Sequence, residues 1–439
     1  MLKLNSNTFY TRHQNELNRY IFNKSDTLHI IADDVEKNNL KNDCDYIFVE
    51  KEENLQKVIK QIDKVYSLII ITDLLESTEE INDIFHQLNL KLIENGKLLI
   101  TSLNNTWYPV INLLEKLKLK KESRKKIYTG VKKLNNVLPK NSLILVDYNT
   151  RQLLPFKVFG IGNFINSLLE ILCSKFNLGI KTYMLLQKIS TSSRQLSKSI
   201  IIPAKNEEKN LVPLIGRIPE FKDMEIIIVC GASEDNTLGV ANSIKEKSSF
   251  NIQVIEQSGK GKANAVFEAL AITRNDAIAI LDSDISVDPE TLTDFFRILE
   301  NGEADFVNGT RFVYRMEKDS MRFFNIIGNK IFQFLIAIVI SRNLSDSLCG
   351  TKVFQKELKE KILTWQGYNK APDPFGDFDM LFSAAFSGQS IAEYPIHYRS
   401  RQYGKTQISR FRDGFKLLYY FINSVVNFNS SIDRELKHF

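Results

Sequence analysis

Residues 279–284 read Ala279-Ile280-Leu281-Asp282-Ser283-Asp284, an apolar run that ends in two carboxylates with one residue between them. The run after Asp276 is short and uncharged up to Leu281, which is typical of a buried strand. In an extended chain, residues i and i+2 point to the same side. Asp282 and Asp284 are therefore predicted to converge on one divalent cation at the strand's carboxyl end. Mg²⁺ takes one or two carboxylates and completes its shell with substrate phosphate oxygens.

Asp-x-Asp also occurs as a turn that caps a helix, and a helix is expected to start near Asp288-Pro289-Glu290. The pair alone does not separate a metal site from a cap. The segments on either side of it have to decide.

Composition limits the possible functions of the chain. A length of 439 residues predicts two or three domains. Hydrophobic residues make up 43% and charged residues 25%, as in ordinary globular proteins. A net charge of +6 favours anionic substrates or an anionic membrane surface and does not indicate nucleic-acid binding. The four cysteines are far apart, which argues against a zinc site or a disulfide framework.

The sequence also predicts where the protein works. Its first residues lack the apolar core of a signal peptide. The longest apolar runs, near 331–340 and 417–426, are too short to span a bilayer. We expect a cytoplasmic protein whose membrane contact is peripheral, at the inner face of the membrane. An amphipathic C-terminal helix, with the aromatic stripe Phe415, Tyr419, Phe421 and Phe428, is either core or the membrane-facing element.

Residues 1–189 alternate between predicted strands and helices, which indicates a parallel α/β sheet. Strands are expected at 26–32, 46–49, 66–72 and 97–102, with a helix over 79–93 and a turn at Asn95-Gly96. Residues 164–176 read as a helix. Residues 182–186 read as a strand that closes this sheet or packs against the second half. A small polar linker follows at 190–198.

The run from Tyr66 to Pro109, with an acidic residue near Asp73, resembles the later part of class I S-adenosylmethionine methyltransferases. The resemblance implies a Rossmann-like, methyltransferase-type sheet. That family's first strand leads into a glycine-rich cofactor loop, whereas residues 1–95 contain no glycine. We therefore expect a methyltransferase-like domain without that activity. It would act as a scaffold or recognise a partner.

Residues 199–439 repeat a pattern of buried strand, polar turn and helix. Strands are predicted at 199–203, 225–230, 251–256 and 276–281, and the helix after the second strand is expected to carry Glu234 and Asp235 in its first turn. Two glycines and two lysines at 259–262 open a further helix. Backbone N–H groups and Lys260 or Lys262 there suit a diphosphate. Open α/β sheets bind ligands at the carboxyl ends of such strands.

Four segments, IIIPAKNEE, IIIVCGASEDNT, SGKGKANAV and AILDSDISVDPE, resemble nucleotide-sugar glycosyltransferases of family 2 in order and spacing. The resemblance covers about 199–421 and implies the GT-A fold, with Asp-x-Asp holding Mg²⁺ or Mn²⁺ on the donor diphosphate. Downstream segments at 308–311, 346–352, 376–379 and 393–406 are similar to polyprenyl (dolichyl) phosphate sugar synthases.

The resemblance implies roles for particular residues. Arg311 and Arg322 would face the phosphates or the acceptor, and Arg401 would lie on a loop that closes over the diphosphate. Asp377 or Asp379 would deprotonate a hydroxyl acceptor, or orient arginines if the acceptor is a phosphate. The expected metal residues are Asp282 and Asp284. The expected substrate-binding residues are Pro203, Ala204, Asn206, Glu207, Gly259, Lys260, Gly261, Lys262, Asp282, Ser283, Arg311 and Arg322.

Two positions depart from the family pattern. Cys230-Gly231 stands where the family has an acidic pair, so a contact to the base or ribose is lost or moves to Glu207 or Asp235. Gln407 stands where a lysine is common. Both leave the identity of the nucleotide open.

The sequence thus predicts a metal-dependent inverting glycosyltransferase that uses a nucleoside-diphosphate sugar. The acceptor would be a polyprenyl phosphate or a glycan precursor of the cell surface, and nucleic acid is not an expected partner. The alternative is an S-adenosylmethionine-dependent methyltransferase joined to a degenerate, binding-only transferase domain.

Overall fold

The computed structural model describes residues 13–31, 44–49, 55–74, 81–116, 142–151, 178–190, 193–314, 323–340, 344–369, 373–401, 403 and 410–430. The chain divides into two compact units, one of Met1–Thr191 with Phe428–Phe439 and one of Ser192–Asn427. The division falls inside the predicted linker. The second part of that linker is anchored to the second unit, because Leu196 is buried in its core and Arg194 N donates to Glu300 O at 2.9 Å.

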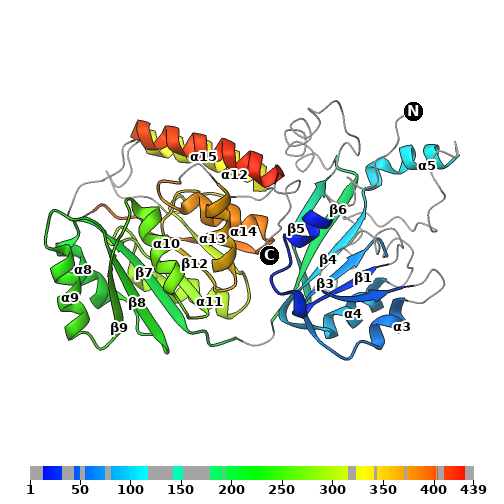
Figure 1. Cartoon of the computed structure of the whole chain (residues 1–439), viewed down its shortest axis with the longest axis horizontal. Coiled ribbons are helices and arrows are strands. Elements are labelled where there is room, and N and C mark those ends of the chain that lie inside the picture. The colour runs from blue at the N-terminus through cyan, green and yellow to red at the C-terminus, as the bar shows by residue number, and fades with distance from the viewer. Residues whose placement is uncertain are drawn as a thin grey trace. The chain divides into compact units, whose positions relative to one another are not determined.

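The first unit contains a six-stranded sheet in the order β2-β1-β3-β4-β6-β5 (Figure 1). β2, β1, β3 and β4 run parallel, and β6 is antiparallel to both β4 and β5. The strands are β1 (Thr27–Ile31), β2 (Asp45–Phe48), β3 (Tyr66–Thr72), β4 (Leu92–Leu103), β5 (Leu143–Arg151) and β6 (Lys181–Lys188). The helices are η1 (Lys24–Asp26), α3 (Leu55–Lys60), α4 (Ile81–Leu90), η3 (Asn105–Trp107) and α5 (Tyr108–Lys116).

The strands predicted in this unit are confirmed, and the strand at 182–186 belongs to this sheet as β6, between β4 and β5. The turn expected at Asn95-Gly96 is wrong. Both residues lie inside β4, where Asn95 has a φ of 60° and the register against β3 shifts. A bulge of this kind keeps the strand continuous while the extra residues are accommodated. The helix predicted over 164–176 lies outside the described residues.

The second unit contains a seven-stranded sheet in the order β13-β11-β12-β10-β7-β8-β9. β12 is antiparallel to its neighbours β10 and β11, and the other neighbouring pairs are parallel. The strands are β7 (Lys198–Ala204), β8 (Met224–Cys230), β9 (Asn251–Glu256), β10 (Ala277–Ile280), β11 (Phe306–Thr310), β12 (Lys352–Gln355) and β13 (Ile391–Pro395). The helices are α8 (Glu208–Arg217), α9 (Thr237–Lys247), α10 (Lys262–Ile272), η4 (Pro289–Thr291), α11 (Leu292–Glu300), α12 (Phe323–Ile340), α13 (Leu358–Tyr368), α14 (Asp377–Phe386) and α15 (Arg410–Ser430).

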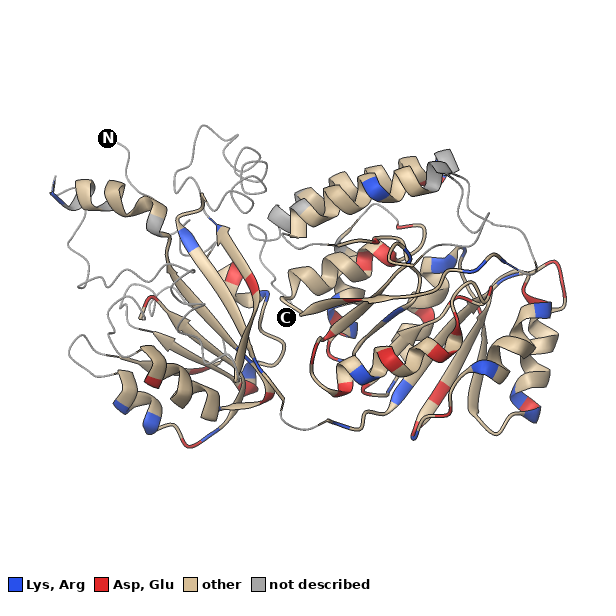
Figure 2. Cartoon of the chain, turned by 180° about the vertical axis from the view of Figure 1, so that it is seen from behind, with Lys and Arg blue, Asp and Glu red and all other residues tan. Residues whose placement is uncertain are grey.

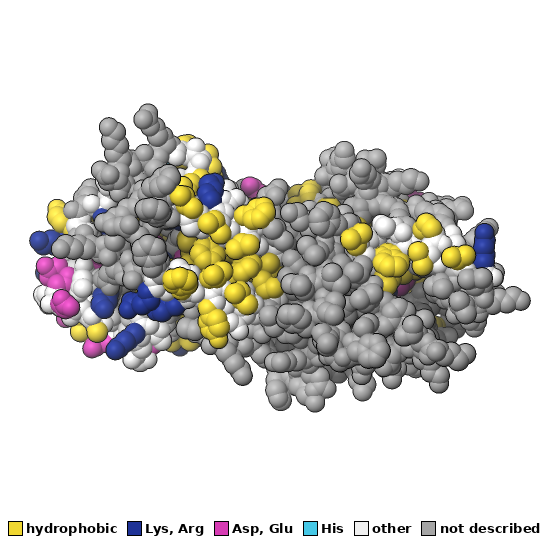
Figure 3. Space-filling view, turned by 90° about the horizontal axis from the view of Figure 1, so that it is seen from above, with side chains coloured by type: hydrophobic (Ala, Val, Ile, Leu, Met, Phe, Trp, Pro, Cys, Tyr) yellow, Lys and Arg dark blue, Asp and Glu magenta, His cyan; other side chains and the backbone are white. Residues whose placement is uncertain are grey.

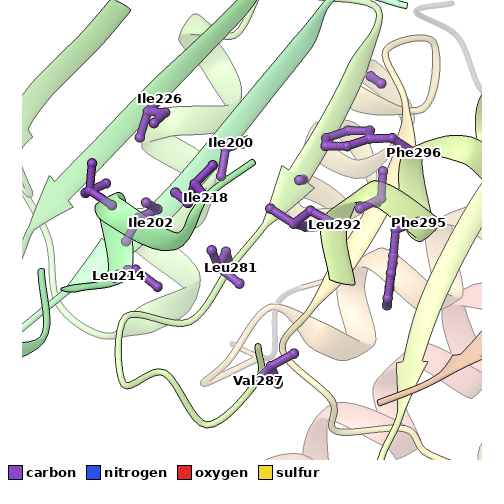
Figure 4. Packing of buried hydrophobic residues seen from close by; sticks show 14 of the residues in the cluster. Ile200, Ile202, Leu214, Ile218, Ile226, Leu281, Val287, Leu292, Phe295 and Phe296 are labelled. Atoms are coloured by element: carbon purple, nitrogen blue, oxygen red, sulfur yellow. The ribbon is translucent and has the colours of Figure 1, made fainter. Parts of the chain in front are cut away.

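Alternating side chains of the central strands build the core of this unit. Ile200, Ile202 and Ile226 pack with Leu214 of α8 and Phe295 of α11 in one buried cluster (Figure 4). Residues in between, such as Ile201 and Ile227, are also fully buried. Strands that are apolar on both faces need cover on both, and α10 lies against β7 and β8. The polar loops are therefore left at the strand ends.

The helix expected to carry Glu234 and Asp235 in its first turn begins later, at Thr237. Asp235 precedes the helix and caps two helices at once. Its Oδ1 accepts from Thr237 N at 3.0 Å in α9, and its Oδ2 accepts from Glu208 N at 3.2 Å in α8. A short acidic side chain is favourable in this position because it satisfies free N–H groups at the positive end of the helix dipole.

The C-terminal helix α15 has one buried side and one exposed side that carries large apolar residues. Leu417, Tyr420 and Ser424 are buried, with spacings of three and four residues. Phe415 and Tyr419, on another face of the helix, are 71% and 58% exposed. Among the described helices, none has the length and hydropathy needed to span a bilayer.

Candidate active site

Polar loops meet beyond the carboxyl ends of β7, β8 and β10. Ser283 Oγ donates to Pro203 O at 2.9 Å, which ties the loop after β10 to the end of β7. Gly231 N donates to Ala204 O at 2.9 Å. Asn206, with a φ of 57°, donates its N–H to Ser233 Oγ and accepts from Glu234 N through Oδ1 at 2.8 Å. Hydrogen bonds thus join the loops after β7, β8 and β10 at this edge of the sheet, and they involve Pro203, Ala204, Asn206 and Ser283.

Asp282 lies against Lys262 at this edge. Lys262 Nζ is 2.5 Å from Asp282 Oδ1, so the first residue of α10 reaches the loop after β10. Burial alone would lower the pKa of Lys262, but Asp282 and Asp377 outweigh it and hold that pKa above its ordinary value. Burial alone would raise the pKa of Asp282, and Lys262 holds it below its ordinary value instead. Both side chains are therefore charged at neutral pH.

Gly350 forms one wall of this ion pair. A Cβ at Gly350 would overlap both the Asp282 carboxylate and the Lys262 amine. Because glycine has no side chain, the backbone of the 346–352 loop can approach the two charges directly. This close approach explains why a glycine is needed in that loop.

Asp284 forms its ion pair with Arg401 and not with Lys262. It is 6% exposed, its Oδ1 accepts from Ser286 N at 3.0 Å, and its Oδ2 lies 2.7 Å from Arg401 Nη2. Arg401 reaches it because the chain after β13 runs beside the 284–287 loop, where Val287 bridges Tyr398. Burial raises the pKa of the Tyr398 hydroxyl, and Asp284 and Asp282 add to this while Arg311 opposes it.

The prediction that Asp282 and Asp284 share one side of an extended strand is wrong in its local geometry. β10 ends at Ile280, and both carboxylates lie in the loop that follows. They still share one electrostatic environment, because Asp282 and Asp284 both act on Lys262. The described residues contain no group of three or more His, Cys, Asp or Glu side chains that could enclose a metal ion by themselves.

The Gly259–Lys262 segment leads into α10, and contacts with the first turn of that helix fix its conformation. Gly261, with a φ of 89°, is the N-cap of α10. Gly259 donates to Asn264 Oδ1 at 3.0 Å, and a side chain at Gly259 would overlap Asn264. Lys260 is exposed and Lys262 is turned inward. Lys262 is therefore the lysine that the fold brings to the carboxylates.

Asp377 faces this edge from another element. It is buried at the start of α14, and its Oδ1 lies 3.2 Å from Nζ of the fully buried Lys352 at the start of β12. Lys352 also donates to Asn308 Oδ1 at 3.0 Å and to Cys349 O. Asp377 therefore joins the charged group through Lys352 and through its effect on Lys262.

The structure does not bring Asp379 to this edge. Its buried carboxyl accepts a hydrogen bond from Tyr420 of α15. Burial, together with Asp373, raises the pKa of Asp379 well above its ordinary value. Asp373 itself caps α14 by accepting from Phe378 N at 2.8 Å and Asp379 N at 3.1 Å. Of the two acids considered as a base, only Asp377 lies with Lys262 and Lys352.

Glu207 lies at the N-terminus of α8, 9% exposed. Burial raises its pKa to about 6, with Asp284 adding to the effect while Asn210 and Arg401 oppose it. Glu207 is therefore within electrostatic reach of the Asp284–Arg401 pair. Asp235, the other residue considered for the missing nucleotide contact, is already engaged as a helix cap.

Arg311 is engaged inside the protein. Its guanidinium binds Asp346 bidentately, with Nε 2.6 Å from Oδ2 and Nη2 2.8 Å from Oδ1. Burial alone would lower the pKa of Arg311, but Asp346 outweighs it and raises that pKa. The expectation that Arg311 faces the phosphates is therefore replaced by a structural role, which is to hold the 344–350 loop. Arg322 lies outside the described residues.

Sequence reasoning missed Lys352, Asp346, Glu393 and Tyr398. Glu393 accepts from Ser345 N at 2.8 Å and supports the same loop as Asp346. Lys352 and Asp346 stand in segments that carried the resemblance. A lysine beside the apolar run of a central strand was the available signal, because a buried charge requires a partner.

The second half of the chain is similar to known proteins. Residues 199–363 match the glycosyl transferase family 2 model, so the second half contains a domain of that family. The chain is 27% identical over 224 residues to the low-salt glycan biosynthesis hexosyltransferase Agl6 of Haloferax volcanii, covering 50% of this chain and 51% of that protein. The chain thus spans about half the length of this relative.

A dolichol-phosphate mannosyltransferase of Mycosarcoma maydis is 26% identical over 54% of this chain and 80% of its own length. A dolichyl-phosphate hexose transferase of Haloferax volcanii is 26% identical over 49% of this chain and 88% of its own length. Among solved structures, glucosyl-3-phosphoglycerate synthase from Mycobacterium tuberculosis aligns with a TM-score of 0.41 at 18% identity, covering 52% of this chain and 78% of that one.

Proposed function

We propose that the second unit transfers a sugar from a nucleoside-diphosphate sugar to an acceptor, with a GT-A fold. The observation that carries this is the charged group Lys262–Asp282 and Asp284–Arg401 at the carboxyl edge of the sheet, within the residues that match family 2. Two carboxylates beside two cations suit a diphosphate and its metal ion better than a neutral ligand.

The donor would lie across residues 204–207, 259–262 and 282–284. Asp282 and Asp284 fit Mg²⁺ or Mn²⁺, because these hard cations take oxygen ligands from one or two carboxylates and the remainder from phosphates and water. When bound, the cation neutralises charge on the diphosphate. In the structure the carboxylates are neutralised by Lys262 and Arg401. Both cationic side chains are then available to turn to the phosphate oxygens.

The reaction would be a single displacement with inversion at the anomeric carbon. The acceptor oxygen forms a bond to C1 as the C1–O bond to the diphosphate breaks, and the bonding electrons leave with the diphosphate. Once turned to the phosphates, Lys262 and Arg401 stabilise that leaving group, because the fold already holds both cationic side chains at this edge of the sheet. Asp377 takes the proton of a hydroxyl acceptor. A phosphate acceptor has no such proton, and Asp377 then orients Lys352.

A lipid phosphate acceptor is the proposal that the surface of this unit favours. α12 and α15 carry exposed large apolar side chains, and Figure 3 shows hydrophobic side chains gathered on the face where these helices lie. These residues are Ile327, Ile331, Phe334, Phe415, Leu418, Tyr419 and Ile422. Most of the length of these two helices is uncharged (Figure 2): α12 has one charged residue, Lys330, and those of α15 all lie between Arg410 and Lys416. The basic residues Arg412 and Lys416 lie at the start of α15, near one end of this apolar face.

We propose that this apolar face rests on the inner face of a membrane, with the protein otherwise in the cytoplasm. Two relatives are named for dolichyl phosphate transfer, which is consistent with a polyprenyl phosphate at this site. A glycan precursor of the cell surface is the other acceptor considered. Sedimentation with anionic vesicles tests the contact: Tyr419→Glu with Ile422→Glu should abolish binding, and equal binding would overturn it.

For the first unit, a methyltransferase-like fold without methyl transfer remains the prediction. Asp73, at the end of β3, has a φ of 53° and its carboxylate pairs with Lys181 of β6. The alternative, a methyltransferase joined to a binding-only transferase domain, requires S-adenosylmethionine binding. Calorimetry on the full chain tests it, and we expect no binding heat.

A panel of isotopically labelled sugar nucleotides with a polyprenyl phosphate acceptor tests the main proposal. We expect transfer from one of them, lost in Asp284→Asn while the unfolding temperature is kept. Asp223→Asn is the matched control, because it makes the same change at an exposed residue whose positive φ of 54° asparagine tolerates. Full activity of Asp284→Asn would exclude this site.

A further inference from the structure

The first turn of α14 is held on two opposite sides. Asp377 and Asp379 are two residues apart in a helix, so their side chains point in nearly opposite directions. Asp377 faces Lys352 at the edge of the sheet, with 3.2 Å between Oδ1 and Nζ. Asp379 accepts from the Tyr420 hydroxyl of α15. The direction of Asp377 therefore depends on how Asp379 is anchored.

Tyr420 is built into this contact and has no access to solvent. Its hydroxyl donates to Asp379 and accepts from Trp365 Nε1 at 3.0 Å, which joins α15, α14 and α13. Phe378, between the two acids, packs against Phe332 of α12 with centroids 5.4 Å apart and against Tyr420 at 6.0 Å. The helices α12 and α15, which carry the exposed apolar face, thus both contact the first turn of α14.

Asp379 makes no ion pair within the part of the chain that the structure describes. Removing the Tyr420 hydroxyl would therefore deprive a buried carboxyl of a hydrogen bond. A buried polar group in that position lowers its energy by turning toward another partner. Because Asp377 and Asp379 lie in the same helical turn, such a rotation would also move Asp377 away from Lys352.

We propose that Tyr420 is a positioning residue, which acts through Asp379 to hold Asp377 against Lys352 at the transfer site. The proposal rests on the proposed function of that site and adds a device that links the α12–α15 layer to it. Tyr420 itself touches neither Asp377 nor Lys352 by any of its hydrogen bonds described above. Its influence on transfer must therefore pass along α14.

A double-mutant cycle on the full chain tests this. Tyr420→Phe is expected to lower kcat about tenfold and leave KM for the sugar nucleotide within about twofold. In an Asp377→Asn background the same substitution should have no further effect on kcat, because the group it positions is already gone. An equal loss in both backgrounds, or no loss in the first, would overturn the proposal.

Tyr394→Phe is the matched control. It removes another tyrosine–aspartate hydrogen bond of this unit, from Tyr394 Oη to Asp294 Oδ2 at 2.6 Å, and is expected to keep wild-type kcat. Should Tyr420→Phe not fold, Tyr420→Phe with Asp379→Leu leaves no buried carboxyl unpaired, which favours folding. It also removes the hydrogen bond that anchors the first turn of α14, so kcat should still fall about tenfold, and an unchanged kcat would overturn the proposal. Wild-type protein that transfers no sugar would overturn both this inference and the function on which it rests. Wild-type transfer with unaltered Tyr420→Phe would overturn the inference alone.

Discussion

Lys262 Nζ lies 2.5 Å from Asp282 Oδ1, and this contact joins the first turn of α10 to the loop after β10. The two residues are separated along the chain by a whole helix and strand. Their contact places a cation beside the first carboxylate of Asp-Ser-Asp, while Arg401 occupies the second at Asp284. A ligand that carries both a metal ion and phosphates can satisfy all four groups together.

Lys262→Met should lower transfer about 100-fold, because a positive charge fixed beside the leaving diphosphate is lost. Lys260→Met should lower it much less, about threefold, since Lys260 is exposed and does not reach Asp282. Steady-state transfer assays with the two variants measure this. Equal losses would show that both lysines serve the loop in the same way.

Removal of divalent cations should abolish transfer, and Mg²⁺ or Mn²⁺ should restore it. In Asp282→Asn the Mn²⁺ concentration for half-maximal activity should rise at least about tenfold, because one ligand loses its charge. Titration of activity against free Mn²⁺ gives the value. An unchanged midpoint would remove Asp282 from the metal site.

Glu207→Gln should change how stability depends on pH. The pKa of Glu207 is raised by burial from 4.5 to about 6, so the folded state binds more protons than the unfolded state in that interval. Stability therefore falls as pH rises from about 4.5 to about 6, and the loss persists above it. Glutamine cannot ionise and should be more stable than wild type at pH 7 by about 1–2 kcal/mol, and not at pH 4.

Urea unfolding at the two pH values measures this difference. A gain of equal size at both pH values would mean that Glu207→Gln acts by packing and not by removing a buried charge.

Arg311→Lys should destabilise the second unit by about 2 kcal/mol, because lysine cannot reproduce the bidentate contact with the fully buried Asp346. Arg399→Lys is its control. Arg399 binds Asp288 in a similar way but is half exposed, and we expect a loss below about 1 kcal/mol. Chemical unfolding compares them, and equal losses would contradict a structural role peculiar to Arg311.

Much of the fold could be predicted from local pattern. The apolar runs that form β1, β3, β7, β8 and β10 are short and bounded by polar turns, a pattern that predicts buried strands. β9 was also predicted as a strand, but its Asn251, Gln253 and Glu256 are exposed. The turn predicted at Asn95-Gly96 is wrong, because β4 already begins at Leu92 and continues through both residues with a bulge against β3. Local preference for a turn yields there to pairing with β3.

The sequence by itself determined that Asp282 and Asp284 follow a buried strand and that glycines and lysines open the preceding helix. Only the tertiary structure decided which partners these groups have. In the folded chain Lys262 pairs with Asp282, whereas Lys260 is exposed. Asp284 pairs with Arg401. Asp377 and Asp379 lie on opposite sides of α14, against Lys352 and Tyr420 respectively. The physical reason is that burial and neighbouring charges decide whether an ionisable side chain is stable in its charged form. Those neighbours come from strands and helices that are distant along the chain.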